Sequence, residues 1–397
     1  MKRRVVVTGI GPITSIGIGK RDFFDRLLAC ETNVKEIPAA YEARCRFKSR
    51  YYTPFPDFRL PDEVETKYEN VMEKTSQIAV AATHLALRDA GLKNVERASV
   101  ILGVGISTLK TAFQSHLAHL GEHTAARFNR MIIPMMMTNA AAAWVSILFG
   151  IKGPAWTLNA ACASGTCAIG EAYRKIADGY CDTAIAGGVE CLEDPSGSTM
   201  RGFDALGALT TSPDGIPRPF STERSGFLFS EGGGCVLVLE EFEHARRRVA
   251  RVYAEIAGYA MNSDAHNIVR MEDSGVSIDA LLEDLLDGCR PAYFNAHGTG
   301  TPMNDQIEAA AIRRLFGDAA HQPLINSTKG FIGHTIGAGK IHGNILGEPM
   351  PDLNLVKETV EMPIESAVSV SFGFGGHNAA LFLTKPDLRE SLTGRHS

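Results

Sequence analysis

Hydrophobic residues in this chain form short continuous runs, separated by longer segments with helical spacing. Residues 5–11 are β-branched and end in glycines, which is typical of a buried strand that leads into a loop. Residues 22–28 and 73–90 carry apolar side chains at helical intervals, and Gly91 stands where a helix commonly ends. Further buried strands are predicted at residues 99–105, 184–187, 235–239, 292–295, 324–327, 368–371 and 381–383.

Continuous apolar strands that alternate with helices predict an α/β fold, in which helices cover both faces of a sheet. At 397 residues the chain is too long for one simple core, so a two-lobed or duplicated fold is expected. The charged segment 240–251 lies near the middle and marks the expected joint. We therefore predict an N-terminal half of residues 1–245 and a C-terminal half of residues 246–397.

The composition excludes several classes of function. Hydrophobic residues make up 45% of the chain and charged residues 21%, as in ordinary globular proteins. The net charge of −5 provides no general positive field for nucleic acid or an anionic membrane. The apolar stretch 140–149 is shorter than the roughly 20 residues of a membrane-spanning helix. The eight cysteines lack metal-ligand spacing, and a strand begins where a signal peptide would stand, so we expect a cytoplasmic protein without a metal ion.

Cys162 carries the most chemical information. It lies in the segment Trp-Thr-Leu-Asn-Ala-Ala-Cys-Ala-Ser-Gly-Thr-Cys-Ala-Ile-Gly (156–170), where a short apolar strand turns directly into a helix of small residues. Unpaired backbone N–H groups and the helix dipole at such a terminus favour the thiolate over the thiol. We therefore predict that Cys162 is a nucleophile.

Three further segments each end a predicted strand with glycines and polar residues. Such turns let backbone N–H groups approach a ligand closely. His297, taken alone, fits a structural role equally well, but three such loops together with a nucleophilic cysteine indicate one site. The segments are Asn-Ala-His-Gly-Thr-Gly-Thr-Pro (295–302), Asn-Ser-Thr-Lys-Gly-Phe-Ile-Gly-His (326–334) and Ser-Val-Ser-Phe-Gly-Phe-Gly-Gly-His-Asn (369–378).

In this order, the four segments resemble those of the β-ketoacyl-acyl carrier protein synthases, the decarboxylating condensing enzymes of fatty acid and polyketide synthesis. The resemblance extends over nearly the whole chain, from residues 5–11 through Arg218-Pro-Phe and Gly226-Phe to Gly373-Phe-Gly-Gly. It implies the thiolase fold, an α/β fold in which two similar halves stack in five layers, α-β-α-β-α.

The resemblance also implies a role for each reactive residue. Cys162 would accept an acyl group from a carrier-protein thioester. After a malonyl-type thioester loses CO2, His297 and His334 would donate ring N–H groups to the enolate oxygen. The enolate carbon would attack the acyl group, whose oxyanion the backbone N–H groups of Cys162 and Phe374 would hold. Lys329 would keep the histidine region electropositive.

The remaining implied contacts concern the substrate and the partners. Thr299 and Thr301 resemble the family's contacts to a phosphopantetheine arm, Phe374 resembles its gate on the acyl pocket, and Phe372 and Asn378 are assigned to substrate binding. The resemblance implies no cofactor of the enzyme itself, because the arm arrives on the acyl carrier protein, which is the expected partner. A homodimer or a ketosynthase heterodimer is expected.

The chain departs from the family pattern after Gly339. A long apolar helix with a glutamate that pairs with the lysine is expected there, but Lys-Ile-His-Gly-Asn-Ile-Leu-Gly-Glu-Pro follows, and the chain is shorter by about one helix. The partner of Lys329 is therefore open, with Glu308 and Glu348 as candidates; a buried lysine without a partner would lose its proton. His377 stands where the family usually has threonine.

Other functions stay open. A partner subunit that sets chain length beside an active synthase fits the shortened region, although such subunits typically lack the nucleophile that Cys162 provides. Another acyltransferase on the thiolase fold is also compatible with the cysteine. A thiolase would carry a second cysteine in the terminal turn, where residues 373–377 have none, and a cysteine protease would leave the glycine-rich loops unexplained. Acyl groups of different lengths and both pathways, fatty acid and polyketide synthesis, are compatible with the sequence.

Overall fold

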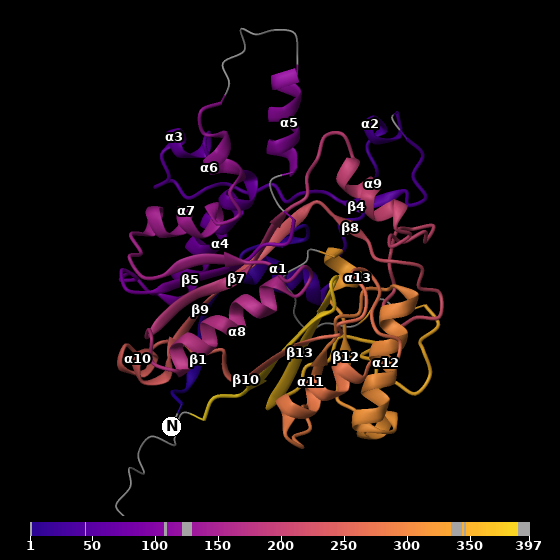
Figure 1. Ribbon diagram of the computed structural model, residues 1–397. Helices are drawn as coiled ribbons and strands as arrows, with labels where there is room; N and C mark the ends of the chain where they lie inside the picture. Colours follow the sequence, from indigo (N-terminus) through magenta and orange to yellow (C-terminus); the bar gives the residue numbers. More distant parts are fainter. Residues whose placement is uncertain are drawn as a thin grey trace, which may run out of the picture.

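One long sheet runs through the molecule and carries most of its strands (Figure 1). The computed structural model describes residues 2–43, 45–106, 109–120, 129–334, 344 and 347–387. The strands of the long sheet lie in the order β12-β11-β13-β14-β10-β1-β9-β7-β5-β6. Their bounds are β1 Val5–Thr14, β5 Ser99–Gly103, β6 Ala155–Leu158, β7 Thr183–Cys191, β9 Gly232–Glu241, β10 Ala254–Ser263, β11 Tyr293–Asn295, β12 Leu324–Asn326, β13 Ser366–Gly373 and β14 His377–Thr384.

The same strand pattern occurs twice in this sheet. In the first half, β1 pairs antiparallel with β9, β9 antiparallel with β7, and β7, β5 and β6 follow in parallel. In the second half, β10, β14, β13, β11 and β12 repeat that order and those directions. The halves meet where Val5 to Val7 pair with Ala254 to Ile256. The described strands thus form two repeated units.

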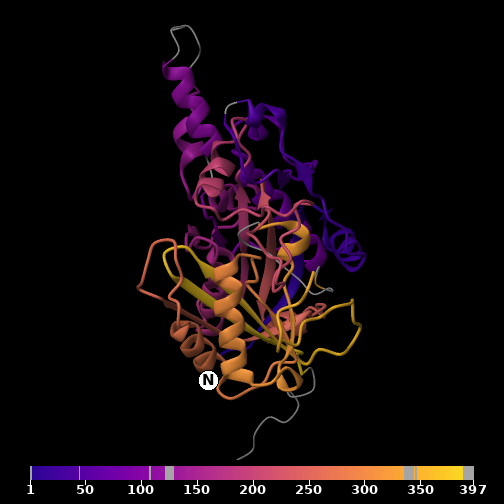
Figure 2. The same ribbon diagram turned by 90° about the vertical axis from the view of Figure 1, so that its right-hand side faces the viewer.

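Helices pack on both faces of these strands, and small elements complete the described fold (Figures 1 and 2). The main helices are α1 Lys20–Leu28, α4 Lys74–Ala90, α5 Leu109–Leu120, α7 Ala140–Phe149, α8 Ser164–Ala177, α9 Ser198–Ala205, α11 Val276–Leu286 and α12 Pro302–Phe316. Short elements are α2 Ala39–Glu42, α3 Thr66–Glu69, α6 Ile132–Met136, α10 Phe242–Arg247, α13 Lys329–Ile332, the 3-10 turn Ala319–His321, β2 Gly17–Ile18, β3 Lys35–Glu36, β4 Tyr51–Thr53 and β8 Phe229–Ser230.

The helix α4 forms where its apolar spacing predicts it. The Glu73 side chain accepts the N–H of Thr75 at its start, and Gly91 ends it in the left-handed conformation. The helix lies against β1 at very short range, because a Cβ atom at Gly11 would stand 2.0 Å from the carbonyl oxygen of Ala82. Burial of this interface gives the first half its core.

The helix α8 lies between the two halves and contacts strands of both. It packs on β5 and β7 of the first half and on β10 and β14 of the second. Gly170 permits the second contact, since a Cβ atom there would stand 2.3 Å from the ring of Tyr259 on β10. The turn that leads into this helix, which contains Cys162, is therefore held at the junction of the halves.

Part of the segment that departs from the family pattern lies outside the described residues, namely residues 335–343 and 345–346. In the described part of the second half, β12 is followed by α13, which has four residues, whereas α8, which follows β6 in the first half, has 14. Residues 388–397 of the tail are also outside the described ranges.

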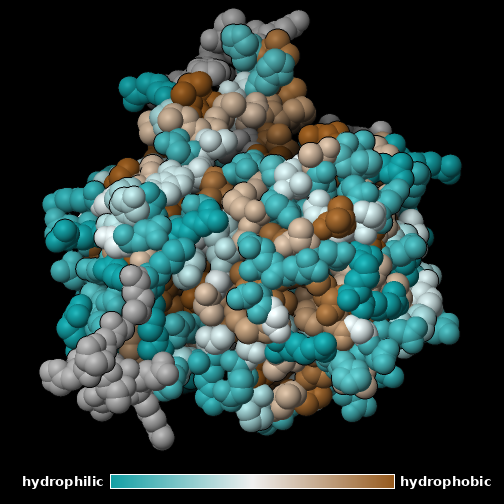
Figure 3. Space-filling view, turned by 60° about the horizontal axis from the view of Figure 1, so that its bottom comes forward, coloured by the Kyte–Doolittle hydropathy of each residue, from teal (hydrophilic) through white to brown (hydrophobic). Residues whose placement is uncertain are grey.

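The helix α5 projects from the body (Figure 2). Four of its apolar side chains are exposed to solvent. Leu109, Phe113, Leu117 and Leu120 are 43%, 42%, 53% and 65% exposed. Hydrophobic residues are visible on this projecting part in Figure 3, above a largely hydrophilic surface. Among the described helices none is long and apolar enough to cross a membrane.

Candidate active site

Cys162 lies in the tight turn between β6 and α8 and lines a cavity of about 200 Å³, here called the front cavity. Ala161 before it has a φ of 47°, in the left-handed region that residues with a Cβ atom rarely adopt. Ser164 stabilises the turn, because its Oγ donates to the carbonyl oxygen of Ala161 at 2.6 Å and accepts the N–H of Ala160 at 2.9 Å. The strained turn presents the sulfur at the start of the helix.

The resting state of Cys162 differs from the thiolate expected from the helix terminus. Burial raises the pKa of the Cys162 thiol to about 11; the charge of Lys329 and the backbone N–H groups of Phe374 and Cys162 oppose this shift. Loss of water around the sulfur thus outweighs the favourable groups. At neutral pH, Cys162 is therefore protonated.

Alkylation by iodoacetamide tests this resting state. Because the thiolate is the reacting species, the alkylation rate of Cys162 should rise about tenfold per pH unit from pH 7 to pH 10. The rate is measured by intact mass, with the Cys162→Ala protein as the control for other cysteines. A rate that levels off below pH 8 would show a lowered pKa and contradict this account.

His334 is hydrogen-bonded to the nucleophile. Its Nε2 lies 3.1 Å from Cys162 Sγ, and the edge of its ring meets Phe227 at a centroid distance of 5.1 Å. Burial, and then the positive charge of Lys329, lower the pKa of His334 to about 3. The ring is therefore neutral at neutral pH and has one N–H donor.

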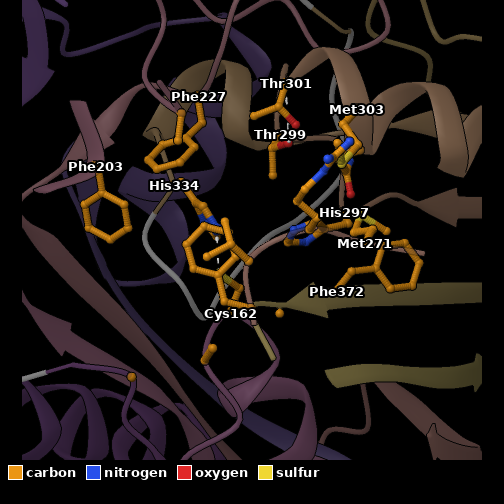
Figure 4. A pocket seen from close by; sticks show the side chains of 18 of the residues that line it. Cys162, Phe203, Phe227, Met271, His297, Thr299, Thr301, Met303, His334 and Phe372 are labelled. Atoms are coloured by element: carbon orange, nitrogen blue, oxygen red, sulfur yellow. Dashed lines mark hydrogen bonds between the residues drawn. The ribbon is translucent and has the colours of Figure 1, made fainter. Parts of the chain in front are cut away.

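His297 stands beside His334, with ring centroids 5.6 Å apart and the rings nearly perpendicular (Figure 4). It lies two residues after the end of β11, and it is 4% exposed. Burial, together with the charges of Lys329 and His334, places the pKa of His297 well below its usual value. The two imidazoles thus border the front cavity next to the sulfur, and both are neutral at neutral pH.

Glu308 on α12 fixes the loop that carries His297. Its Oε1 accepts the N–H of His297 and its Oε2 accepts the N–H of Gly298, both at 2.8 Å. Lys329 binds the other side of the same residue, because its Nζ donates to the carbonyl oxygen of His297 at 2.5 Å. Glu308 and Lys329 therefore bind the backbone N–H and the backbone carbonyl oxygen of His297, respectively.

Glu308 is also the acidic residue that lies next to Lys329. Burial lowers the pKa of Lys329, and the negative charge of Glu308 is the largest effect that opposes the shift. Burial raises the pKa of Glu308 in turn. Glu348, the other candidate, is exposed, and its carboxylate accepts the hydroxyl of Thr222 at 3.4 Å. Of the two candidates, Glu308 takes the place next to the lysine.

A Glu308→Gln variant tests the positioning role. The amide cannot accept both N–H groups and carries no charge for Lys329, so we expect condensation to fall about tenfold or more. Acyl transfer to Cys162, followed separately by mass spectrometry, should fall much less, because Glu308 acts through His297. Glu348→Gln is the matched surface control. Equal losses in the two variants, or in the two half-reactions, would count against the role.

The predicted oxyanion donors converge on the sulfur. Backbone N–H groups of Phe374 and Cys162 both act on the Cys162 thiol. The turn after β13 approaches closely because residue 373 is glycine; a Cβ atom there would stand 2.6 Å from the carbonyl oxygen of Ala160. Two fixed N–H donors next to a reacting sulfur are suited to hold an oxyanion.

The predicted substrate contacts are brought together in part. Thr299, Thr301, Phe372 and Phe374 line the front cavity, and the hydroxyl oxygens of the two threonines are 2.9 Å apart. Asn378 is not among the described residues that line this cavity. It is 2% exposed, and its amide donates to Asp264 Oδ1 at 2.7 Å and Asn262 Oδ1 at 3.1 Å. The side chain joins β14 to β10 and its following loop.

An aromatic wall of the front cavity was not predicted. Phe203 and Phe227 meet edge to face at a centroid distance of 5.6 Å, on the His334 side of the cavity (Figure 4). Met271 and Met303 lie across from them, near His297 and Phe372. Within the sequence, only the pair Gly226-Phe pointed to this wall. The residues that form the wall come from loops and helices that are far apart in the sequence, so no single motif contains them.

Two family profiles match the chain, "Beta-ketoacyl synthase, N-terminal domain" at residues 2–244 and "Beta-ketoacyl synthase, C-terminal domain" at residues 253–346. The chain belongs to the β-ketoacyl synthase family. It is 33% identical to 3-oxoacyl-[acyl-carrier-protein] synthase 2 of Coxiella burnetii (strain RSA 493 / Nine Mile phase I) over 415 aligned positions, which cover 97% of this chain and 99% of that protein. Because 415 exceeds the 397 residues present here, the relative carries segments that this chain lacks.

Solved ketosynthases share the fold. A type II polyketide synthase acyl carrier protein in complex with its ketosynthase, bound to the hexaketide, matches with a TM-score of 0.87 at 27% identity over 97% of this chain and 100% of that one. The ishigamide ketosynthase/chain length factor matches with a TM-score of 0.85 at 27% identity, over 98% and 100%. The predicted thiolase fold and the predicted class, a condensing acyltransferase of the β-ketoacyl synthase family, are confirmed.

Proposed function

We propose that this β-ketoacyl synthase condenses an acyl group held on Cys162 with a malonyl group held on an acyl carrier protein. The observation that carries the proposal is the grouping of Cys162 Sγ, 3.1 Å from His334 Nε2, with the neutral ring of His297 beside them. A hydrolase would need one base that activates water. Two neutral imidazole donors beside a thiol suit acyl transfer followed by stabilisation of an enolate.

The first step is transfer of the acyl group between sulfurs. The Cys162 sulfur attacks the thioester carbonyl, and the N–H groups of Cys162 and Phe374 hold the oxyanion. The carbon–sulfur bond to the pantetheine arm then breaks, and the thiol proton of Cys162 ends on the leaving sulfur. His334, hydrogen-bonded to the sulfur, lies on the path of that proton.

The second step is loss of CO2 from the malonyl thioester. The bond between the carboxylate and the α-carbon breaks, and its electron pair forms the enolate. The enolate oxygen accepts hydrogen bonds from the ring N–H groups of His297 and His334. The α-carbon then attacks the acyl carbonyl on Cys162, and the sulfur leaves as a thiolate that takes up one proton from solvent to restore the thiol. A neutral ring keeps one N–H group, so each histidine can donate a hydrogen bond to the enolate oxygen.

We propose that substrates arrive on the phosphopantetheine arm of an acyl carrier protein, so that the chain needs no cofactor of its own. The related type II polyketide ketosynthase is described in complex with its acyl carrier protein. Thr299 and Thr301 line the front cavity and would bind the arm. A cytoplasmic location fits the eight free cysteines.

We further propose that the chain forms a dimer through the first half. β6 is an edge strand of the long sheet, and the nearby helices expose Ile133 (64%), Ile147 (62%) and the apolar side of α5. The partner is a second copy or, as in the ishigamide ketosynthase/chain length factor, a different subunit.

Intact mass of the isolated chain tests the function and its alternative. Incubation with an acyl-acyl carrier protein should add the mass of the acyl group, and digestion should place it on Cys162. If the isolated chain stays unmodified and acyl transfer needs a second subunit, the chain is instead the partner subunit of a heterodimer. The shortened C-terminal half is the observation that favours that second candidate.

A further inference from the structure

Three buried polar side chains on the first two turns of α12 lie next to the loop that contains His297. They belong to Asn304, Asp305 and Glu308, which are 5%, 0% and 0% exposed. Two carboxylates buried so close together are unfavourable unless hydrogen-bond donors surround them. The donors around this pair therefore matter for whatever the two carboxylates hold in place.

The two carboxylates hold one loop, residues 297–300, at its start and at its end. Asp305 Oδ1 accepts the N–H of Gly300 at 3.1 Å, and its Oδ2 accepts the N–H of Phe220 at 2.8 Å. Glu308 holds the start of the loop through two backbone N–H groups, both at 2.8 Å. Protonation would turn one acceptor oxygen of a carboxylate into an O–H donor and weaken the hydrogen bond that this oxygen accepts. The loop is thus held best when both groups are ionised.

The amide of Asn304 joins the two carboxylates. Its Nδ2 donates to Asp305 Oδ1 at 3.1 Å and to Glu308 Oε2 at 3.2 Å. Because ionised carboxylates only accept hydrogen bonds, the nitrogen of the amide is the side that must face them. Each proton of one NH2 group is therefore directed at a different negative charge.

Proton uptake by this pair occurs close to neutral pH. Burial, together with the negative charge of Asp305, raises the pKa of Glu308 to about 7. Burial also raises the pKa of Asp305, and the hydrogen bond from Asn304 opposes this rise. Interacting groups of this kind titrate as a pair. Loss of the Asn304 amide should therefore raise the pH at which the pair takes up its first proton.

Two cations also face the pair. Lys329 on α13 opposes the effect of burial on Glu308, and Arg224, whose Nε lies 4.0 Å from Asp305 Oδ2, opposes it on Asp305. The neighbouring ring of His297 is neutral and adds no charge. Each cation acts mainly on one carboxylate. Among the described residues, the Asn304 amide is the group that donates to both.

We propose that Asn304 is a positioning residue whose amide bridges Asp305 and Glu308, and that these carboxylates in turn hold the loop that presents His297 to the enolate. The inference rests on the proposed function, in which His297 donates to the enolate oxygen. Asn304 acts through the loop and not on the reacting atoms. Its loss should affect the release of CO2 and leave acyl transfer to Cys162 largely unchanged.

Asn304→Ala and Asn304→Leu test this role, because they differ in size and share the loss of both N–H donors. The acid limb of the pH profile of CO2 release from malonyl-acyl carrier protein should move up by about one pH unit in both variants. Release should then be about five times slower than in the wild type at pH 7, and it should approach the wild-type rate at pH 9. Gln306→Leu, which removes an exposed amide from the same helix, is the matched control and should keep the wild-type profile.

Hydrogen exchange of the peptide that contains residues 297–300 provides a readout that needs no substrate. After correction for the intrinsic pH dependence of exchange, deuterium uptake at pH 7 should be faster in both Asn304 variants than in the wild type. The difference should shrink at pH 9. If the wild-type protein releases no CO2, the proposed function fails, and the exchange rates still decide the role of Asn304.

Slower CO2 release by the same factor at every pH would make Asn304 a contact of the substrate, since it also lines the front cavity, and would overturn the proposal. A shifted profile in only one of the two variants would assign the effect to packing and count equally against the bridge. Wild-type exchange of the 297–300 peptide in both variants would show that the loop does not depend on Asn304.

Discussion

Replacing Cys162 with alanine should lower formation of the β-ketoacyl product by about four orders of magnitude or more. The variant cannot form the acyl thioester, and no other cysteine among the described residues lines the front cavity. Product is measured by mass spectrometry of the carrier protein after incubation with acyl and malonyl substrates. Loss of CO2 from the malonyl thioester should continue, because that step uses His297 and His334.

Cys289→Ala is the matched control, since Cys289 is an exposed free cysteine. It should keep wild-type activity. Product formation by the Cys162→Ala protein at a substantial fraction of the wild-type rate would refute covalent catalysis at this residue.

Removal of either histidine has the second-largest expected effect. We expect His297→Ala and His334→Ala each to slow CO2 release from malonyl-acyl carrier protein by about 10²–10³-fold, the usual loss when one donor to a developing oxyanion is removed. His297→Ala should still take up an acyl group on Cys162, because the histidine hydrogen-bonded to the sulfur is His334. The rates of the two half-reactions are measured separately on each variant.

His377→Ala is the control for this pair. His377 begins β14 and is not among the described residues that line the front cavity. Its replacement should leave both half-reactions near the wild-type rate. Undiminished CO2 release in both His297→Ala and His334→Ala would exclude the enolate role.

The strands and the reactive residues were the predictable part of this molecule. Buried strands such as β7 and β9 are continuous apolar runs, so their positions follow from sequence pattern alone. Cys162, His297 and His334 each end a strand or a short helix in a glycine-rich loop, and the fold brings those loops together. The order of the motifs is therefore enough to predict which loops meet.

Other features depend on packing that no short pattern reports. β10 was missed because its sequence, Ala254–Ser263, mixes small, polar and aromatic residues and buries only two of its ten side chains. The thiolate expected at Cys162 follows from the helix terminus, but the opposing desolvation depends on everything packed around the sulfur. Glu308 lies 11 residues after His297, and only the fold shows that its carboxylate binds that main chain.

The most direct test of the central claim is to follow the malonyl carboxylate with an isotopic label. With acyl-acyl carrier protein and malonyl-acyl carrier protein labelled at the free carboxylate, we expect one labelled CO2 for each β-ketoacyl product, with no label in the product. A product that retains the label, or forms without release of CO2, would contradict decarboxylative condensation at Cys162, His297 and His334.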